Sequence, residues 1–503
     1  MEYAIAVIDI GMTNKKVAIY DDALRHLDTR YLVFEPVIIN GLPCHDLDAM
    51  EEYFTAEIKA LAEKYPVKAI SVSTHGATFV CVGENGKAAV PCVYYTHEPG
   101  DVFHERFYQT FGQKTELQAR TGTPAFRALI NPAKGIFFAQ EQFADRFKNV
   151  TLVLPYPQYW GYRFTGKTGI ESTYMGNHTY LWDQIENRFS EVARNLGIAE
   201  KLPPASESGG LHKSWDVLGT ISGEFAANTN LPKDTIVTMG IHDSNSSLLP
   251  HFVKKGERGF ILNSTGTWCV IMNPVEKYGF SGDELGKVVF FNISAFGTPI
   301  KTAIFLGGME FETWSELIQK QHGRSDNPPW NEQLYRRILN ERRAFLLPEL
   351  TQGSGQFPSS KARVSIDGKN YFYSKTCGTF ADYETSFALL RVSLVMQTLT
   401  ALDRAGIQNG FDICTEGGFR KDESYSRLLS SYYPENKVFL TDINEASALG
   451  AAMIAKMALG RKSLHDLAQD FEINYIEQQK GNFPEMEAYR QAWLKEAWLG
   501  KKL

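Results

Sequence analysis

The sequence predicts an α/β protein composed of two related halves. Apolar strands alternate with helical segments along most of the 503 residues, a pattern typical of the α/β class. A strand–turn–strand unit opens the chain at AIAVIDIGMTNKKVAIYDD and recurs at RGFILNSTGTWCVIMNP. In both units an apolar strand enters a turn rich in small and hydroxyl residues. The repetition predicts a division between the halves near residues 244–258.

In the N-terminal half, the strand–turn–strand unit is followed by an amphipathic helix over DLDAMEEYFTAEIKALAEKY, which Asp46 or Asp48 can cap. The strand AISVS comes next, and then a hairpin signalled by Glu84-Asn85-Gly86 between apolar runs. The half ends at TIVTMGIHDSNSS, which we expect to be a strand that runs into a polar turn.

In the C-terminal half, YETSFALLRVSLVMQTLTALDRAG predicts a long amphipathic helix that Gly406 terminates. DICTEGGFRKDESYSRLLSSYY and VFLTDINEASALGAAMIAKMALG each predict a strand, a turn and a helix. We therefore expect one domain over residues 1–247, a second over 255–460, and a charged tail over 461–503 that is helical in parts.

Composition favours an enzyme that handles small molecules. Hydrophobic residues make up 43% of the chain, enough for large cores, and the net charge is 52 − 58 = −6. Nucleic-acid binders usually carry a basic surplus, so we expect no nucleic-acid partner. The N-terminus has no positively charged leader, and no apolar run approaches the roughly 18 residues that span a bilayer. We expect a soluble, cytoplasmic protein without a membrane partner. The sequence does not decide whether it forms a homodimer.

Six cysteines are scattered along the chain without a CxxC pair or regular spacing. We expect reduced, mostly buried thiols, and no zinc or iron–sulfur site. They are Cys44, Cys81, Cys92, Cys269, Cys377 and Cys414.

Residues 161–168, GYRFTGKT, match the P-loop pattern GxxxxGK[ST] letter for letter. That pattern binds phosphate only where a buried strand feeds a loop of small residues. The preceding PYPQYW makes such a strand improbable by composition, and Tyr162, Arg163 and Phe164 would crowd a phosphate. We interpret the match as a surface turn after an aromatic-rich helix.

The first turn, Asp9 to Lys16, carries residue types suited to a nucleotide phosphate. Asp9 at the end of a strand can reach Mg²⁺ directly or through water. Thr13 and Asn14 offer donors to phosphate oxygens, and Lys16 supplies a mobile positive charge. The alternative is an ordinary polar hairpin with a solvated lysine pair.

Three other segments are weaker candidates when taken singly. The turn at Thr265, Gly266 and Thr267 can hold phosphate through backbone N–H and hydroxyl donors, or is simply a polar β-turn. Gly417 and Gly418 offer flat backbone to a nucleotide, or form a packing corner. Asp243 becomes a candidate base if it faces a cleft and meets a substrate hydroxyl, whereas His75 is by default structural.

The order of these segments is more specific than any one of them. DIGMTNKK, HGA, YRFTG, GIHDSN, STGTW, CTEGG and EASALGAA, spread over residues 4–460, resemble the FGGY carbohydrate kinase family. YRFTG is similar to the family's Leu-Thr-Gly turn, which accounts for the P-loop match.

The resemblance implies two actin-like (ribonuclease-H-like) domains around a cleft in which ATP and a sugar meet. It also implies a role for each candidate residue: Asp243 as general base; Asp9 at Mg²⁺; Thr13, Asn14, Lys16, Thr265, Gly266 and Thr267 at the phosphates; Gly417 and Gly418 at the adenosine; and His75, Gly76, His242 and Ser244 in the sugar pocket.

The motifs disagree about the sugar. The Thr-Asn pair of the first turn resembles L-fuculokinases, and the His242–Asp243 pair resembles both L-fuculokinases and L-rhamnulokinases. The segment around His75 is similar to that of xylulokinases instead. Thr78 stands where deoxysugar kinases commonly have Asp, and Tyr95-Thr96-His97 replaces the family's Trp-x-Asp.

We therefore expect a ketose kinase. L-Fuculose or L-rhamnulose is the first candidate substrate, and a ketopentose such as xylulose or ribulose is the second. Other polyols are further candidate substrates. Two rivals are an actin-like ATP-binding sensor without transfer activity, and a kinase outside this family that uses residues 161–168 as its P-loop.

Overall fold

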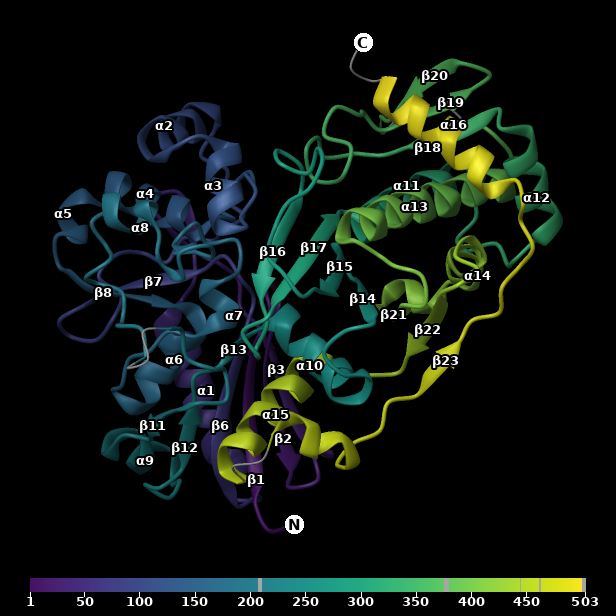
Figure 1. Cartoon of the computed structure of the whole chain (residues 1–503). Helices are drawn as coiled ribbons and strands as arrows, with labels where there is room; N and C mark the ends of the chain where they lie inside the picture. The colour runs from purple at the N-terminus through teal and green to yellow at the C-terminus, as the bar shows by residue number, and fades with distance from the viewer. Residues whose placement is uncertain (207–209, 375–379, 444, 461–462, 500–503) are drawn as a thin grey trace.

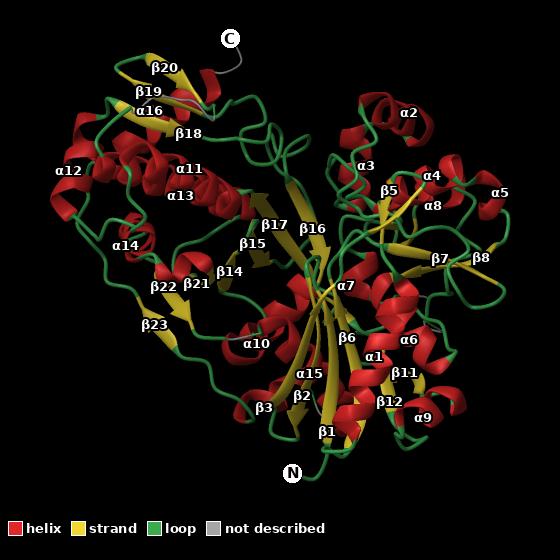
Figure 2. Ribbon diagram, turned by 180° about the vertical axis from the view of Figure 1, so that it is seen from behind, coloured by secondary structure: helices red, strands yellow, loops and turns green. Residues whose placement is uncertain are grey.

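Two seven-stranded sheets form the framework of the protein, one in each half of the chain (Figures 1 and 2). They are seen in a computed structural model that describes all residues except 207–209, 375–379, 444, 461–462 and 500–503.

The N-terminal sheet contains β1 (Ala4–Ile10), β2 (Asn14–Asp21), β3 (His26–Val33), β6 (Val67–Thr74), β11 (Val217–Thr220), β12 (Ile236–Thr238) and β13 (Ile241–His242). Its order is β11-β12-β6-β1-β2-β3, with β13 also paired to β6. Strands β1, β2 and β3 are antiparallel neighbours, whereas β6 runs parallel to β1 and β12 parallel to β6.

The C-terminal sheet contains β14 (Phe260–Thr265), β15 (Cys269–Pro274), β16 (Val289–Ile293), β17 (Pro299–Phe305), β21 (Asp412–Gly417), β22 (Lys437–Thr441) and β23 (Tyr475–Glu477). Its order is β16-β17-β15-β14-β21-β22-β23. The central five strands, β17-β15-β14-β21-β22, repeat the order and directions of β3-β2-β1-β6-β12. This repeat confirms the two related halves that the recurring hairpin predicts.

Smaller sheets pair β4 (Val37–Ile39) with β5 (Leu42–Cys44), β7 (Phe79–Gly83) with β8 (Val150–Pro155), β9 (Trp182–Asp183) with β10 (Arg188–Phe189), and join β18 (Ala344–Leu347), β19 (Arg363–Ile366) and β20 (Lys369–Phe372). The helices are α1 (Leu47–Ala62), α2 (Asp101–Phe111), α3 (Lys114–Thr121), α4 (Pro132–Gln142), α5 (Ala144–Phe147), α6 (Tyr156–Thr165), α7 (Ser172–Met175), α8 (Glu191–Asn195), α9 (Gly223–Thr229), α10 (Asp243–Lys255), α11 (Gly307–His322), α12 (Glu332–Glu341), α13 (Tyr383–Ala405), α14 (Glu423–Tyr432), α15 (Ala446–Gly460) and α16 (Met486–Leu499), with 3₁₀ helices η1 (Gly418–Lys421) and η2 (Leu464–Gln469).

The sheets and helices are layered, with α10 and α15 lying between the two sheets (Figure 1). Alternate residues of β1 reach opposite layers: Ile8 packs toward α1 and α6, whereas Val7 packs toward α10 and α15. Strand β14 behaves likewise, since Leu262 faces α10 and α15 and Ile261 faces α11 and α13. Strands buried on both faces are expected to be apolar throughout, which explains the continuous AIAVIDI run.

Several local predictions are confirmed. Asp46 caps α1 by accepting a hydrogen bond from the Ala49 N–H, and Gly406 ends α13 in the left-handed conformation. The tail is helical in part, because α16 packs into the same core as α13 and the Trp493 indole donates to the Leu346 carbonyl at 2.8 Å.

Other local predictions are wrong. Residues 243–247 begin α10 rather than a polar turn, so the interval between the two expected domains lies inside a packed helix. By contrast, the short hairpin at Glu84–Gly86 does form, because the Gly83 N–H donates to the Lys87 carbonyl and the Ala89 N–H to the Cys81 carbonyl around an antiparallel bridge between Val82 and Ala88. The longer ladder of β7 is made with β8.

Helix α13 is not amphipathic, because it is buried on nearly every face in the C-terminal core. By length and composition it could cross a membrane, contrary to the expectation that no run is long and apolar enough. The share of its most apolar window that is buried inside the protein is 94%, which suits a core helix.

The P-loop match at residues 161–168 does not form a phosphate loop. A strand, β8, does precede it, contrary to expectation, but the chain enters α6 directly at Tyr156. Gly161 to Thr165 belong to that helix, and Gly166 is its left-handed C-cap. The backbone N–H groups of residues 161–165 therefore lie within a helix and cannot curl around a phosphate.

The five described cysteines, Cys44, Cys81, Cys92, Cys269 and Cys414, are buried and free, as expected, while Cys377 lies outside the described residues. Across the described chain, no group of three or more His, Cys, Asp and Glu side chains could hold a metal ion by itself.

The contact between α10 and α15 predicts a sharp stability effect. A Cβ atom on Gly450 of α15 would lie 2.0 Å from the Ser246 carbonyl oxygen of α10. Gly450→Ala should therefore lower the free energy of unfolding by about 1–3 kcal/mol, measured by urea denaturation. Gly135→Ala in α4 is the matched control, because its Cβ meets nothing within 4 Å and helix propensity favours alanine. Equal effects of the two changes would contradict the close contact.

Candidate active site at the junction of the two halves

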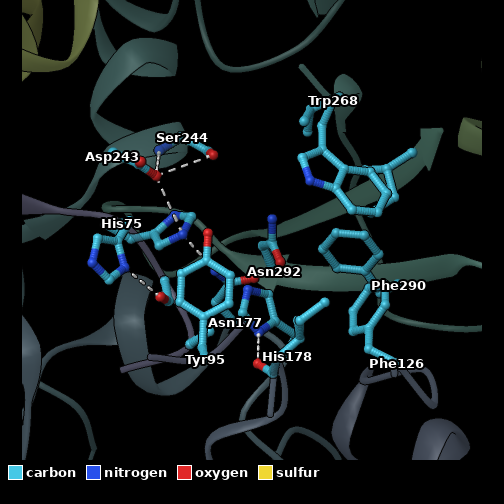
Figure 3. A pocket seen from close by; sticks show the side chains of 16 residues that line it. His75, Tyr95, Phe126, Asn177, His178, Asp243, Ser244, Trp268, Phe290 and Asn292 are labelled. Carbon is cyan, nitrogen blue, oxygen red and sulfur yellow. Dashed lines mark hydrogen bonds and ion pairs between the residues drawn. The ribbon is translucent and has the colours of Figure 1, made fainter. Parts of the chain in front are cut away.

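A cavity of about 190 Å³ lies where the halves meet (Figure 3). The N-terminal half contributes the polar wall and the C-terminal half most of the apolar wall. The polar wall contains His75, Tyr95, Asn177, His178, His242, Asp243 and Ser244. The apolar wall contains Phe126, Ile130, Trp268, Val270, Phe290 and Ile304, with Asn292 beside them.

Asp243, which lines this cavity, is the first residue of α10 and directly follows β13. Its Oδ1 accepts hydrogen bonds from the Ser244 N–H at 2.6 Å and the Ser244 hydroxyl at 3.3 Å. Burial, and then the nearby charge of Asp9, raise the pKa of Asp243 to about 7. A carboxylate with a near-neutral pKa is a suitable acceptor for the proton of a hydroxyl group.

Three histidines in the cavity wall are neutral. Burial lowers the pKa of His75 and of His178 to about 4, and holds that of His242 well below its usual range. His75 Nδ1 contacts the Gly76 carbonyl at 2.8 Å, and His178 Nδ1 contacts the Ile130 carbonyl at 3.1 Å. Each of these Nδ1 atoms is therefore the protonated donor, which leaves Nε2 as an acceptor.

Gly76 contributes space rather than a contact. A Cβ atom there would lie 2.8 Å from His242 Nε2 and 2.9 Å from His178 Nε2. The Asn177 amide donates to the same atom, His242 Nε2, at 2.8 Å and holds the ring in place. Among the predicted sugar-pocket residues, His75, Gly76, His242 and Ser244 are thus all brought together at this cavity.

Several buried polar atoms in the cavity wall have no hydrogen-bond partner within the described chain: His75 Nε2, Asn177 Oδ1, His242 Nδ1 and Asn292 Oδ1. Buried polar groups normally have partners, and an unpaired one costs free energy. A small ligand rich in hydroxyl groups could satisfy them, because each hydroxyl both donates and accepts.

Strand β16 carries Phe290 and Asn292 from the C-terminal half to the cavity and is tied to the N-terminal half. Gln118 donates to the Val289 carbonyl and Gln184 to the Phe291 carbonyl, both at 2.8 Å. The Phe291 N–H in turn donates to the Gly122 carbonyl at 3.0 Å.

The predicted phosphate turn lies between β1 and β2, closed by the Gly11 N–H donating to the Asn14 carbonyl at 2.9 Å. Thr13 and Asn14 are exposed at its tip. Lys15 is buried and donates to the Met12 carbonyl at 2.7 Å, so it holds the turn together.

Lys16 points the other way, into a cluster of charges. Its ammonium lies 2.8 Å from Asp9 Oδ2 and also pairs with Glu445. Burial alone would lower the pKa of Lys16, but attraction to Asp9 and Glu445 outweighs it and the pKa rises above its usual value. Lys16 is therefore a fixed positive charge.

Asp9 suits a Mg²⁺ ion only if other ligands come from the nucleotide and water. Both described contacts of this carboxylate, from Lys16 and from the Ser447 hydroxyl at 2.6 Å, are made to Oδ2. Oδ1 has no partner among the described residues. Mg²⁺ is commonly held by one or two carboxylates together with phosphate oxygens and water, so the residues present fit this ion.

The second predicted phosphate turn joins β14 to β15, closed by the Gly266 N–H donating to the Trp268 carbonyl at 3.0 Å. Thr265 is buried: its hydroxyl donates to the Glu416 carbonyl and accepts from the Phe419 N–H at 3.0 Å. Its side chain therefore braces the turn, which leaves the backbone of Gly266 and the exposed Thr267 to meet a ligand.

A larger cavity of about 550 Å³ opens on the other side of this turn, within the C-terminal half. Gly418 lines it, whereas the Cα of Gly417, with φ +80°, packs against the Thr265 carbonyl. Further lining residues include Gly308, Phe311, Asn327, Trp330 and Ser424. Its size and flat glycine backbone suit a nucleotide base and ribose.

The sequence motifs identified neither the aromatic and amide residues of the small cavity nor the partners of Asp9 and Lys16. Trp268 directly follows the second turn, and Tyr95 marks a departure from the family pattern, so both carried a local signal. Asn177, His178, Phe290 and Asn292 lie in segments without a recognisable pattern. Glu445 and Ser447 lie in the EASALGAA segment, to which the family resemblance assigns no residue role.

Comparisons with known proteins agree with this architecture. The N-terminal domain of the FGGY family of carbohydrate kinases matches residues 4–250, and the FGGY C-terminal domain matches residues 257–463. Rhamnulokinases of Halalkalibacterium halodurans and Enterococcus faecalis are each 25% identical, over 281 and 202 residues. These two matches span 54% and 40% of this chain but only 56% and 38% of the relatives.

Solved structures share the fold along the whole chain. A carbohydrate kinase from Novosphingobium aromaticivorans superposes with a TM-score of 0.79 at 24% identity, covering 99% of both chains. A ligand-bound xylulose kinase from Lactobacillus acidophilus gives a TM-score of 0.79 at 15% identity, over 99% of this chain and 98% of that one. Because the two family domains together match most of the sequence and the predicted two-domain α/β fold is confirmed, the chain belongs to the FGGY family of carbohydrate kinases.

Proposed function

We propose that this protein transfers the γ-phosphoryl group of ATP to a hydroxyl group of a sugar, with Asp243 as the general base. The observation that carries the proposal is the position of Asp243. Asp243 lines the small cavity, and its pKa is influenced by both Asp9 and Lys16 of the phosphate turn.

In this proposal Asp243 accepts the proton of the sugar hydroxyl as that oxygen attacks the γ-phosphorus in line. Phosphoryl transfer demands mainly positioning and charge stabilisation. Lys16 supplies positive charge at the first turn, and the N–H and hydroxyl of Thr267, beside Gly266, supply donors at the second. Mg²⁺, held in part by Asp9, would neutralise phosphate charge.

Thr13 and Asn14 are proposed to contact the phosphates from the tip of the first turn. The larger cavity beside Gly418 is proposed to hold the adenosine. Closure of the halves around both substrates would exclude water, which otherwise competes as the acceptor.

We propose a ketose as the acceptor, with L-rhamnulose or L-fuculose first. The small cavity supports a substrate with one polar edge and one apolar end, such as the methyl group of a deoxysugar against Phe290 and Trp268. The rhamnulokinase relatives favour the same class. Thr78, which stands where deoxysugar kinases commonly have Asp, does not line the cavity.

A ketopentose such as xylulose or ribulose is the second candidate, because the xylulokinase-like His75 also faces the cavity. Such an enzyme would act in the cytoplasm, where ATP and sugars meet. The alternative of another class is an ATP-binding sensor, which needs the larger cavity but no base.

A substrate panel tests the proposal. ATP consumption with Mg²⁺ should depend on one or a few ketoses among ketoses, aldoses and polyols, with a 6-deoxyketose preferred over its hydroxylated analogue. Asp243→Asn should reduce turnover by about 10²–10⁴-fold, because a general base is lost, yet bind ATP as tightly in calorimetry. ATP binding without turnover on a broad panel would instead support the sensor.

The pKa of Asp243 predicts the pH profile. The base must be ionised, so kcat/KM should fall about tenfold per pH unit below a midpoint near 7. Ser244→Ala should move the midpoint upward, because its hydroxyl stabilises the ionised carboxylate. If the midpoint of the fall in kcat/KM at low pH does not move in this variant, that fall reports the ionisation of another group.

Substitutions of two lysines test whether the phosphate turn or the P-loop match binds the nucleotide. Lys16→Met should reduce turnover by about 10²–10³-fold, because a positioned charge beside the transferred group is lost. Lys167→Met should leave turnover within about twofold, since Lys167 is exposed beyond the end of α6. The reverse ranking would mean that residues 161–168 bind the nucleotide.

A further inference from the structure

Strand β3 forms an edge of the N-terminal sheet and is unusually exposed. It is last in the strand order, and no strand of the described chain pairs with its outer side (Figure 2). All eight of its residues are exposed or half-exposed, and it contains neither proline nor glycine. Such an edge offers unpaired N–H and C=O groups to another strand.

Apolar side chains concentrate along this edge. Leu27, Tyr31, Leu32 and Val33 are 37%, 57%, 39% and 52% exposed. With Ile38 they make five of the twelve large hydrophobic side chains that are exposed across the described residues. Natural edge strands are usually kept short or blunted with proline, charges or bulges. In β3 the register with β2 shifts at Leu27, but Asp28 to Val33 pair regularly, and the exposed apolar run Tyr31, Leu32 and Val33 on this regular stretch points to a partner.

The sequence of β3, HLDTRYLV, is complementary to itself when two copies run antiparallel about Thr29. In that register Asp28 faces Arg30 of the partner subunit, and Leu27, at the bulge of the strand, lies opposite Tyr31 of the partner subunit. Each pair occurs twice, and the two Thr29 residues meet on the axis. Opposite charges and apolar pairs directly across an antiparallel ladder are stabilising, whereas a one-residue slip would lose both.

Asp28 and Arg30 are available for such pairing. Within the chain, Asp28 lies 3.4 Å from Arg30 and 4.0 Å from Lys64, and Arg30 lies 3.7 Å from Glu57. These are long contacts between half-exposed groups, which hold the side chains weakly.

We propose that β3 pairs antiparallel with β3 of a second copy of this chain, so that the two N-terminal sheets become continuous across a twofold axis at Thr29. A closed twofold contact uses the same patch on both subunits and cannot propagate into fibres. The charge pattern favours a second copy of this chain over an unrelated extended peptide. Asp28 and Arg30 lie symmetrically about Thr29, which pairs opposite charges only when the partner strand has the same sequence.

Sedimentation velocity of the full-length protein tests the proposal over a range of concentrations. The wild type should dimerise, and Asp28→Arg or Arg30→Asp alone should weaken the dimer at least tenfold by placing like charges opposite each other. The double variant Asp28→Arg/Arg30→Asp should restore it. Lys64→Ala, which removes one contact of Asp28 within the chain and nothing across the proposed interface, should leave the dimer unchanged.

Cysteine cross-linking tests the register. Thr29→Cys should form a disulfide-linked dimer on mild oxidation, because only residue 29 faces its own copy, while Leu27→Cys should stay uncross-linked. The five described native cysteines are buried and should not interfere. A wild type that is monomeric at every concentration would overturn the proposal. So would a dimer that both single charge reversals leave intact, or one that Thr29→Cys fails to link. Circular dichroism of each variant ensures that loss of the dimer is not loss of the fold.

Discussion

The site depends on one close helix contact, the packing of α15 against α10 between the two sheets. Gly450 brings the two backbones together at Ser246, where any side chain would collide. The Ser246 hydroxyl also donates to the Ser447 carbonyl at 2.6 Å, so the N-terminal turns of both helices are joined. One of those turns carries Asp243 and the other carries Ser447, which donates to Asp9. The crossing therefore places the proposed base and the phosphate turn side by side.

Charge in the site is concentrated and only partly balanced. Asp9 and Glu445 both contact Lys16, and Asp243 feels the field of Asp9. Burial, and then the charge of Asp9, raise the pKa of Asp243, and the three neighbouring histidines, kept neutral by burial, do not offset this. A buried carboxylate beside neutral donors and acceptors is suited to handling an uncharged sugar hydroxyl, while Lys16 supplies positive charge for phosphate.

The two turns that close β1–β2 and β14–β15 show how far a repeated motif predicts structure. Each is closed by the N–H of its glycine, Gly11 or Gly266, so the similarity in sequence is also a similarity in backbone. Their side chains differ in role, because Thr265 is buried as a brace whereas Thr13 is exposed. The P-loop match at residues 161–168 shows the opposite case: the letters agree, but α6 takes the backbone into a helix.

The sequence by itself determined the α/β class, both strand–turn–strand units and helices such as α1, because each depends on residues close together in the chain. The ordered series of family-like motifs singled out Asp243 as the candidate base. Only the tertiary structure decided what surrounds them. Asn177 and His178 reach the small cavity through the chain path after α7, and Asn292 comes from the other half on β16, held there by Gln118 and Gln184. The partners of Lys16 and Asp9, Glu445 and Ser447, are more than four hundred residues away. Such contacts arise from the packing of whole layers, which local patterns of hydrophobicity and turn residues do not encode.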